Sequence, residues 1–195
     1  MSRRLIAVAV LCCLGLTGNA TPSPKPNNHA PCKKSSAEKQ MVKLPLYKNS
    51  WQIQQGCGFP KARQVSFAIH LFYTKWLMKF GDEDLLVLKT LNNLMVEWGD
   101  KKKPIPGGAF DVNGNPIVGT ARGLTLMPGY IWIWKNEYNR IAATALIHEL
   151  VHSALWSQSG LHGDPDHEGE EFVGWTPAHT ELIREINNLL AKLDI

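Results

Sequence analysis

Cysteine is scarce in this sequence. Only four occur among 195 residues, and two of them, Cys12 and Cys13, lie inside an apolar N-terminal segment. The other two, Cys32 and Cys57, lack the CxxC spacing that is typical of a cysteine-based zinc site. In an oxidising compartment we expect these two thiols to form a disulfide, with two free thiols as the alternative.

The sequence also lacks a membrane span and a strong charge of one sign. Its N-terminus combines Arg3 and Arg4 with the apolar residues 5–16 and the small segment Gly18-Asn19-Ala20. This layout is typical of a secretory signal peptide, is too short to span a membrane, and predicts cleavage after Ala20. Removal of Arg3 and Arg4 lowers the formal net charge from +4 to +2. So small a balance does not favour nucleic-acid or membrane binding, and we expect an exported protein, periplasmic or secreted.

Three segments follow from this composition. Residues 1–20 are the expected signal peptide, and residues 21–58 are expected to form a flexible leader and N-terminal segment that begins with a stretch rich in Pro, Asn and Ser. Residues 59–195 are long enough for one domain with a hydrophobic core. No internal repeat divides them.

Apolar periodicity predicts an α+β domain. Helical spacing predicts helices over residues 60–80 and 82–98, the second capped by Asp82 and ended by Gly99. Strand-like texture follows at 109–112, 117–119, 123–127 and 130–134. A further helix begins near residue 140 and ends at Gly160, and a last one starts at Thr176 and Pro177.

One motif combines residue types that are typical of a metal site, His148-Glu149-Leu150-Val151-His152. It lies in an apolar run with helical spacing and no Pro or Gly between residues 140 and 158, so a helix is expected. On a helix His148 and His152 project from the same face, where both imidazoles can reach one metal ion. Glu149 lies beside that face, within reach of a metal-bound water. Buried among apolar residues, these three polar groups would be costly without partners.

The motif resembles the HExxH signature of the zincin metallopeptidases. The resemblance implies a zincin-like fold, with helices around a small, mainly antiparallel sheet whose edge strand pairs with substrate. It also implies one catalytic Zn²⁺ held by two histidines, with Glu149 as general base. The chain lacks the HxxGxxH continuation of the metzincins, because Ser153-Ala154-Leu155-Trp156 follows His152.

Catalytic zinc usually has a third protein ligand. His167, followed by Phe172, is similar to the downstream histidine and aromatic of SprT-like zincins and is the expected third ligand. His162 is an alternative, as are several glutamates in the gluzincin manner: Glu168, Glu170, Glu171 and Glu181. His179, Tyr130 and Tyr138 are candidates either for stabilising an oxyanion or for packing.

These observations predict a zinc metalloendopeptidase that acts on a protein or peptide. A peptidoglycan stem peptide is an alternative substrate, as for an envelope hydrolase or an exported toxin. A non-catalytic zinc-binding module is a third interpretation. Glu149 argues against that module, because binding alone needs no general base.

Overall fold

A computed structural model describes residues 40–54, 59–104, 115, 119–135, 140–160 and 174–195 of the chain, and all of them belong to one compact unit. The fold is α+β, as expected, with four α-helices, a five-stranded sheet and a two-stranded hairpin. The expected signal peptide, both mature cysteines, and the strands expected at 109–112 and 117–119 lie wholly or mostly outside the described residues. No described helix is both long and apolar enough to cross a membrane.

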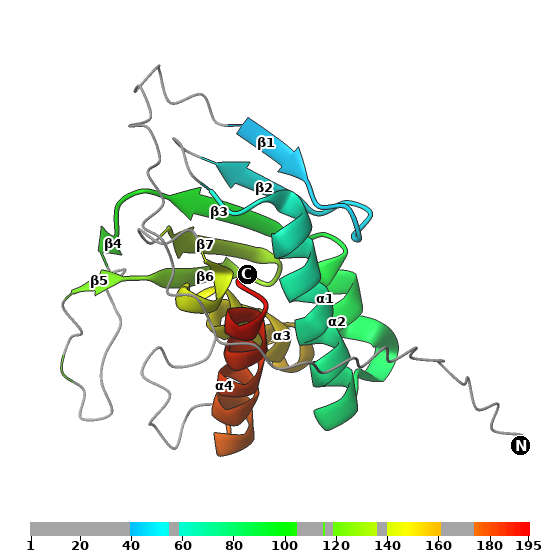
Figure 1. Ribbon diagram of the computed structural model, residues 1–195. Coiled ribbons are helices and arrows are strands. Elements are labelled where there is room, and N and C mark those ends of the chain that lie inside the picture. The colour runs from blue at the N-terminus through cyan, green and yellow to red at the C-terminus, as the bar shows by residue number, and fades with distance from the viewer. Residues whose placement is uncertain (1–39, 55–58, 105–114, 116–118, 136–139, 161–173) are drawn as a thin grey trace, which may run out of the picture. The chain divides into compact units, whose positions relative to one another are not determined.

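The five-stranded sheet has the order β1-β2-β3-β7-β6 (Figure 1). Its strands are β1 (Gln40–Lys43), β2 (Trp51–Gln54), β3 (Met95–Gly99), β6 (Gly123–Met127) and β7 (Tyr130–Trp134). The outer pairs β1–β2 and β6–β7 are antiparallel, whereas β2–β3 and β3–β7 are parallel. The sheet is therefore mixed, not mainly antiparallel as expected. Parallel neighbours need crossover connections, and here α1 (Ala62–Lys79) and α2 (Leu86–Leu91) lie between β2 and β3 in the chain.

Two strands lie ahead of residue 59, within residues 21–58, which were expected to form a flexible leader and N-terminal segment. β1 and β2 hydrogen-bond to each other, and β2 pairs with β3 in the middle of the sheet. Leu44 and Tyr47, in the loop between them, are buried in the core. The folded unit thus includes residues that composition alone assigned to the N-terminal segment.

The prediction of one helix over residues 82–98 is wrong for the second half of that range. A 3₁₀ turn (Glu83–Leu85) leads into α2 (Leu86–Leu91), and residues 95–99 form β3 instead. Met95 and Trp98 continue the helical spacing, but β3 is a central strand with nearly every residue buried, and such strands read as continuous apolar runs. The capping role of Asp82 is confirmed, because its carboxylate accepts hydrogen bonds from the N–H groups of Val87 and Leu88, both at 3.0 Å.

The other helices occur where they were expected, except that the motif helix begins at Leu146 and not near residue 140, because a 3₁₀ turn (Ile141–Ala143) and an extended Thr144 precede it. They are α1 (Ala62–Lys79), α3 (Leu146–Ser159) and α4 (Pro177–Lys192). Gly160 ends α3 in the left-handed conformation at φ 72°, which glycine adopts without strain. Thr176 caps α4 and Pro177 is its first residue. The strands expected at 123–127 and 130–134 are β6 and β7.

One core joins the helices to one face of the sheet (Figure 1). Alternate residues of the central strands, Val96 and Trp98 in β3 and Ile131 and Ile133 in β7, are buried in the same cluster as the apolar residues of the helices. Phe72 and Trp76 of α1 are fully buried there, and each such side chain contributes about 1.5–3 kcal/mol. The helix α3, which carries the HExxH motif, is thereby packed directly against β6 and β7.

Candidate metal centre

The two motif histidines converge. His148 and His152 lie one turn apart on α3, both half-buried, with their Nε2 atoms 3.2 Å apart and their ring centroids 5.0 Å apart. Two nitrogens that bind one tetrahedral zinc ion at about 2.0–2.1 Å lie roughly 3.3 Å from each other. The observed separation therefore fits a pair of zinc ligands.

Glu149 is the next residue after His148 on α3, and its side chain lies against β6. Its side chain is only 5% exposed, and its Oε2 accepts a hydrogen bond of 2.9 Å from the Thr125 hydroxyl. Burial raises the pKa of the Glu149 carboxyl to about 7, while the hydrogen bonds from Thr125 oppose the shift. A carboxyl group with such a pKa can both take up and release a proton near neutral pH.

Two side-chain hydrogen bonds hold α3 against the β6–β7 hairpin. The Thr125 hydroxyl also lies 3.1 Å from the Glu149 backbone carbonyl, so that its one proton is shared between this oxygen and Oε2, and the Gly129 N–H donates to Ser153 Oγ at 2.8 Å. Both are buried, and buried hydrogen bonds position the groups that make them. The motif helix is thus fixed relative to the edge of the sheet.

Gly123 is a site residue that the sequence reasoning missed. A Cβ at this position would lie 2.5 Å from Glu149 Oε1 and 2.8 Å from Ala145 Cβ. Only glycine permits this close approach of β6 to the carboxylate. A glycine at the start of an apolar strand was the available signal, because glycine within a strand often marks close packing.

Trp175 covers the two histidines. Its ring centroid lies 5.3 Å from that of His148 and 5.0 Å from that of His152, and its Nε1 donates to Thr180 Oγ1 at 3.1 Å. The residue immediately precedes the cap of α4, so the start of that helix holds the indole over the motif. No motif in the sequence marks Trp175 as part of this site.

The expected third ligand, His167, lies outside the described residues, as do His162, Glu168, Glu170 and Glu171. Glu181 is described but lies on the surface of α4, where it pairs with Lys79 at 2.7 Å. Within the part of the chain that the structure describes, no group of three His, Cys, Asp or Glu side chains is placed to hold a metal.

The described residues that were candidates for stabilising an oxyanion, His179 and Tyr130, make contacts within the fold. His179 is buried and stacks on Phe80 with ring centroids 4.2 Å apart, and its Nδ1 accepts a hydrogen bond of 2.9 Å from the Thr176 N–H. The Tyr130 hydroxyl donates to Glu97 at 2.6 Å. Tyr138 is outside the described residues. His179 therefore packs against Phe80 and caps α4. Tyr130 is hydrogen-bonded to Glu97, which also forms an ion pair with Lys103.

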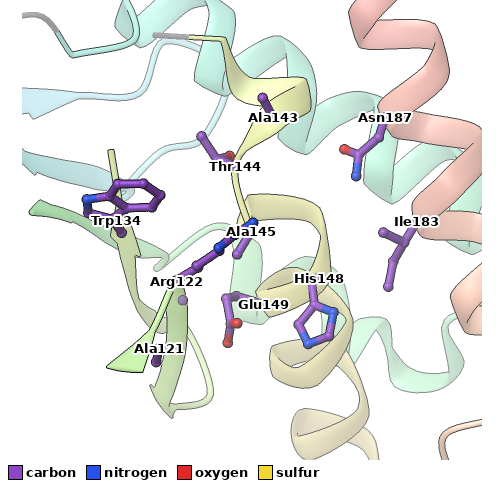
Figure 2. A pocket seen from close by; sticks show the side chains of 11 residues that line it. Ala121, Arg122, Trp134, Ala143, Thr144, Ala145, His148, Glu149, Ile183 and Asn187 are labelled. Carbon is purple, nitrogen blue, oxygen red and sulfur yellow. The ribbon is translucent and has the colours of Figure 1, made fainter. Parts of the chain in front are cut away.

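A cavity of about 400 Å³ opens beside His148 and Glu149 (Figure 2). It lies between the start of β6, the start of α3 and the side of α4, and Arg122, Trp134, Ile183 and Asn187 contribute to its walls. A cavity of this size can hold one amino-acid side chain together with its backbone. The candidate base thus faces a space that a substrate can enter.

Comparisons with known proteins do not assign the chain to a family. No protein-family model matches the sequence, and neither curated proteins nor solved structures give a significant match.

Proposed function

We propose that this protein is a zinc-dependent metallopeptidase of the zincin type that hydrolyses protein or peptide substrates. The observation that carries the proposal is the convergence of His148 and His152 Nε2 at 3.2 Å on one helical turn, with the buried carboxyl of Glu149 on the adjoining residue. His167 is the proposed third ligand, and the N-terminal layout supports a site of action in the periplasm or outside the cell.

The chemistry follows from this arrangement. Bound zinc would polarise a carbonyl group and make water acidic enough to lose a proton near neutral pH. Glu149 takes that proton on its carboxylate and later delivers it to the leaving amine. Thr125 holds the carboxylate in place at 2.9 Å, and Gly123 leaves the space that it occupies.

The sheet supports the same proposal. β6 is the last strand of the five-stranded sheet and packs against α3. An extended peptide can bind by pairing with the backbone of such an edge strand. A peptide aligned along β6 would pass the Glu149 carboxyl, because Gly123 and Thr125 both contact it from this strand.

Zinc analysis and proteolysis of single variants test the proposal. Wild-type protein, purified without chelators, is expected to carry one zinc per chain and to degrade an unfolded protein such as reduced casein. His148→Ala should lose both zinc and activity, whereas Glu149→Gln should keep zinc and lose activity. His70→Ala removes an exposed histidine of α1 and should change neither.

Two results would contradict the proposal. The first is a wild-type protein with no more zinc than His148→Ala, which would leave the two imidazoles as a hydrogen-bonded pair. The second is a Glu149→Gln variant that retains full activity.

A further inference from the structure

The cavity beside Glu149 has one cationic wall. Arg122 lies at the start of β6, and Figure 2 shows its side chain extending from that strand toward the start of α3. The Arg122 carbonyl accepts a hydrogen bond of 2.8 Å from the Trp134 N–H, which fixes the backbone at this point. A guanidinium group anchored at a cavity rim presents up to five donors to whatever enters.

This guanidinium is not used by the fold. Arg122 makes no ion pair with any described carboxylate, and the ion pairs of the described residues involve other cations, namely Lys75, Lys79, Lys103 and Arg140. Among the described residues, the positive charge of Arg122 is therefore available to a ligand.

The opposite wall offers a polar atom that lacks a partner. Asn187 lies on α4, and its Oδ1 is buried without a hydrogen bond in the described part of the chain. Such an unsatisfied acceptor costs about 1–3 kcal/mol. Asn187 thus adds a polar side chain to this wall, with its oxygen shielded from solvent.

The rest of the cavity favours a small anionic group. Its floor is formed by Ala143, Thr144 and Ala145, at the start of α3, where the helix dipole is positive. Ile183 and Trp134 add apolar surface. A residue with a short apolar stem and a carboxylate matches these walls.

We propose that this cavity is a specificity subsite that binds a carboxylate-bearing residue of the peptide next to the cleaved bond, with Arg122 as the group that binds the carboxylate. The inference rests on the proposed peptidase function and adds its substrate class. The carboxylate can belong to an Asp or Glu side chain or to the C-terminus of the peptide. Both present the same planar anion, which a guanidinium binds through two parallel hydrogen bonds.

The first experiment maps cleavage sites in a peptide library by mass spectrometry. Wild-type protein is expected to cut beside Asp or Glu, or beside a free C-terminus, and a C-terminally amidated library separates the two sources. Arg122→Gln should lose this preference, and Arg122→Glu should replace it with a preference for Lys or Arg. Arg63→Gln makes the same change at an exposed arginine of α1 and should cleave as wild type does.

The second experiment measures binding without turnover. In a Glu149→Gln background, calorimetry should show that the best-cleaved peptide binds about tenfold more tightly than its analogue with the carboxylate replaced by an amide. Adding Arg122→Gln should abolish that difference. Arg122 is exposed, so unchanged thermal unfolding of the variant will show that its fold is retained.

The outcomes separate this inference from the proposed function. A wild-type protein that cleaves peptides without any preference for carboxylates, or binds acid and amide peptides equally, overturns the subsite and leaves the peptidase standing. A wild-type protein without zinc and without cleavage overturns both.

Discussion

Replacing Glu149 by Gln is expected to stabilise the metal-free protein at alkaline pH. Burial raises the pKa of this carboxyl from 4.5 to about 7 in the folded state. Because the pKa of Glu149 is higher in the folded state, the stability that its protonated carboxyl contributes is fully present below pH 4.5 and is lost as the pH rises through 7. At about 1.4 kcal/mol per pKa unit, the loss over these 2.5 units reaches about 3.5 kcal/mol above pH 7.

Glutamine removes that loss because it is neutral at every pH and its carbonyl oxygen can accept the Thr125 hydrogen bond. The free energy of unfolding of Glu149→Gln should therefore match that of wild type near pH 4.5, exceed it increasingly up to about pH 7, and exceed it by a constant amount from there to pH 8.5. The assay is urea unfolding in EDTA, followed by tryptophan fluorescence across this pH range. Glu83→Gln, at an exposed glutamate, is the matched control and should change stability by less than about 0.5 kcal/mol.

A difference between Glu149→Gln and wild type that does not vary with pH would refute the reasoning, as would a variant less stable than wild type at pH 8.5. Either result would mean that the carboxylate is solvated or paired in the folded protein. The expected gain also has a functional meaning, because the same burial that costs stability places the proton acceptor beside the proposed metal site.

Two further predictions concern the surroundings of Glu149 and α4. Gly123→Ala should displace the Glu149 carboxyl, since the new Cβ would lie 2.5 Å from Oε1; urea unfolding should show a loss of about 1–3 kcal/mol, and kcat should fall while zinc content is kept. His179 has a lowered pKa because it is buried and near the positive charge of Lys79. Its protonation therefore opposes folding, and the free energy of unfolding falls as the pH drops below about 6.5, the pKa of histidine in the unfolded chain. Stability of His179→Gln should therefore depend less on pH between 7 and 5; an unchanged slope would contradict the assignment.

Sequence reasoning succeeded where the signal is local. The strands at 123–127 and 130–134, the glycine end of α3 and the Thr176–Pro177 start of α4 each depend on a few neighbouring residues, and the structure confirms them. It failed at β3, because Met95 and Trp98 continue the apolar spacing of α2. Periodicity cannot separate a fully buried strand from a buried helix, since neither shows an exposed face.

The sequence by itself determined which residues share the motif turn: the i and i+4 spacing places His148 and His152 on one face of any helix that forms there. It did not determine the environment of Glu149, because Gly123 and Thr125 contact it from a strand more than twenty residues away. The mixed order of the sheet likewise depends on pairings between distant segments. The tertiary structure decided both, since burial and strand pairing are set by packing between segments that carry no local signal of each other.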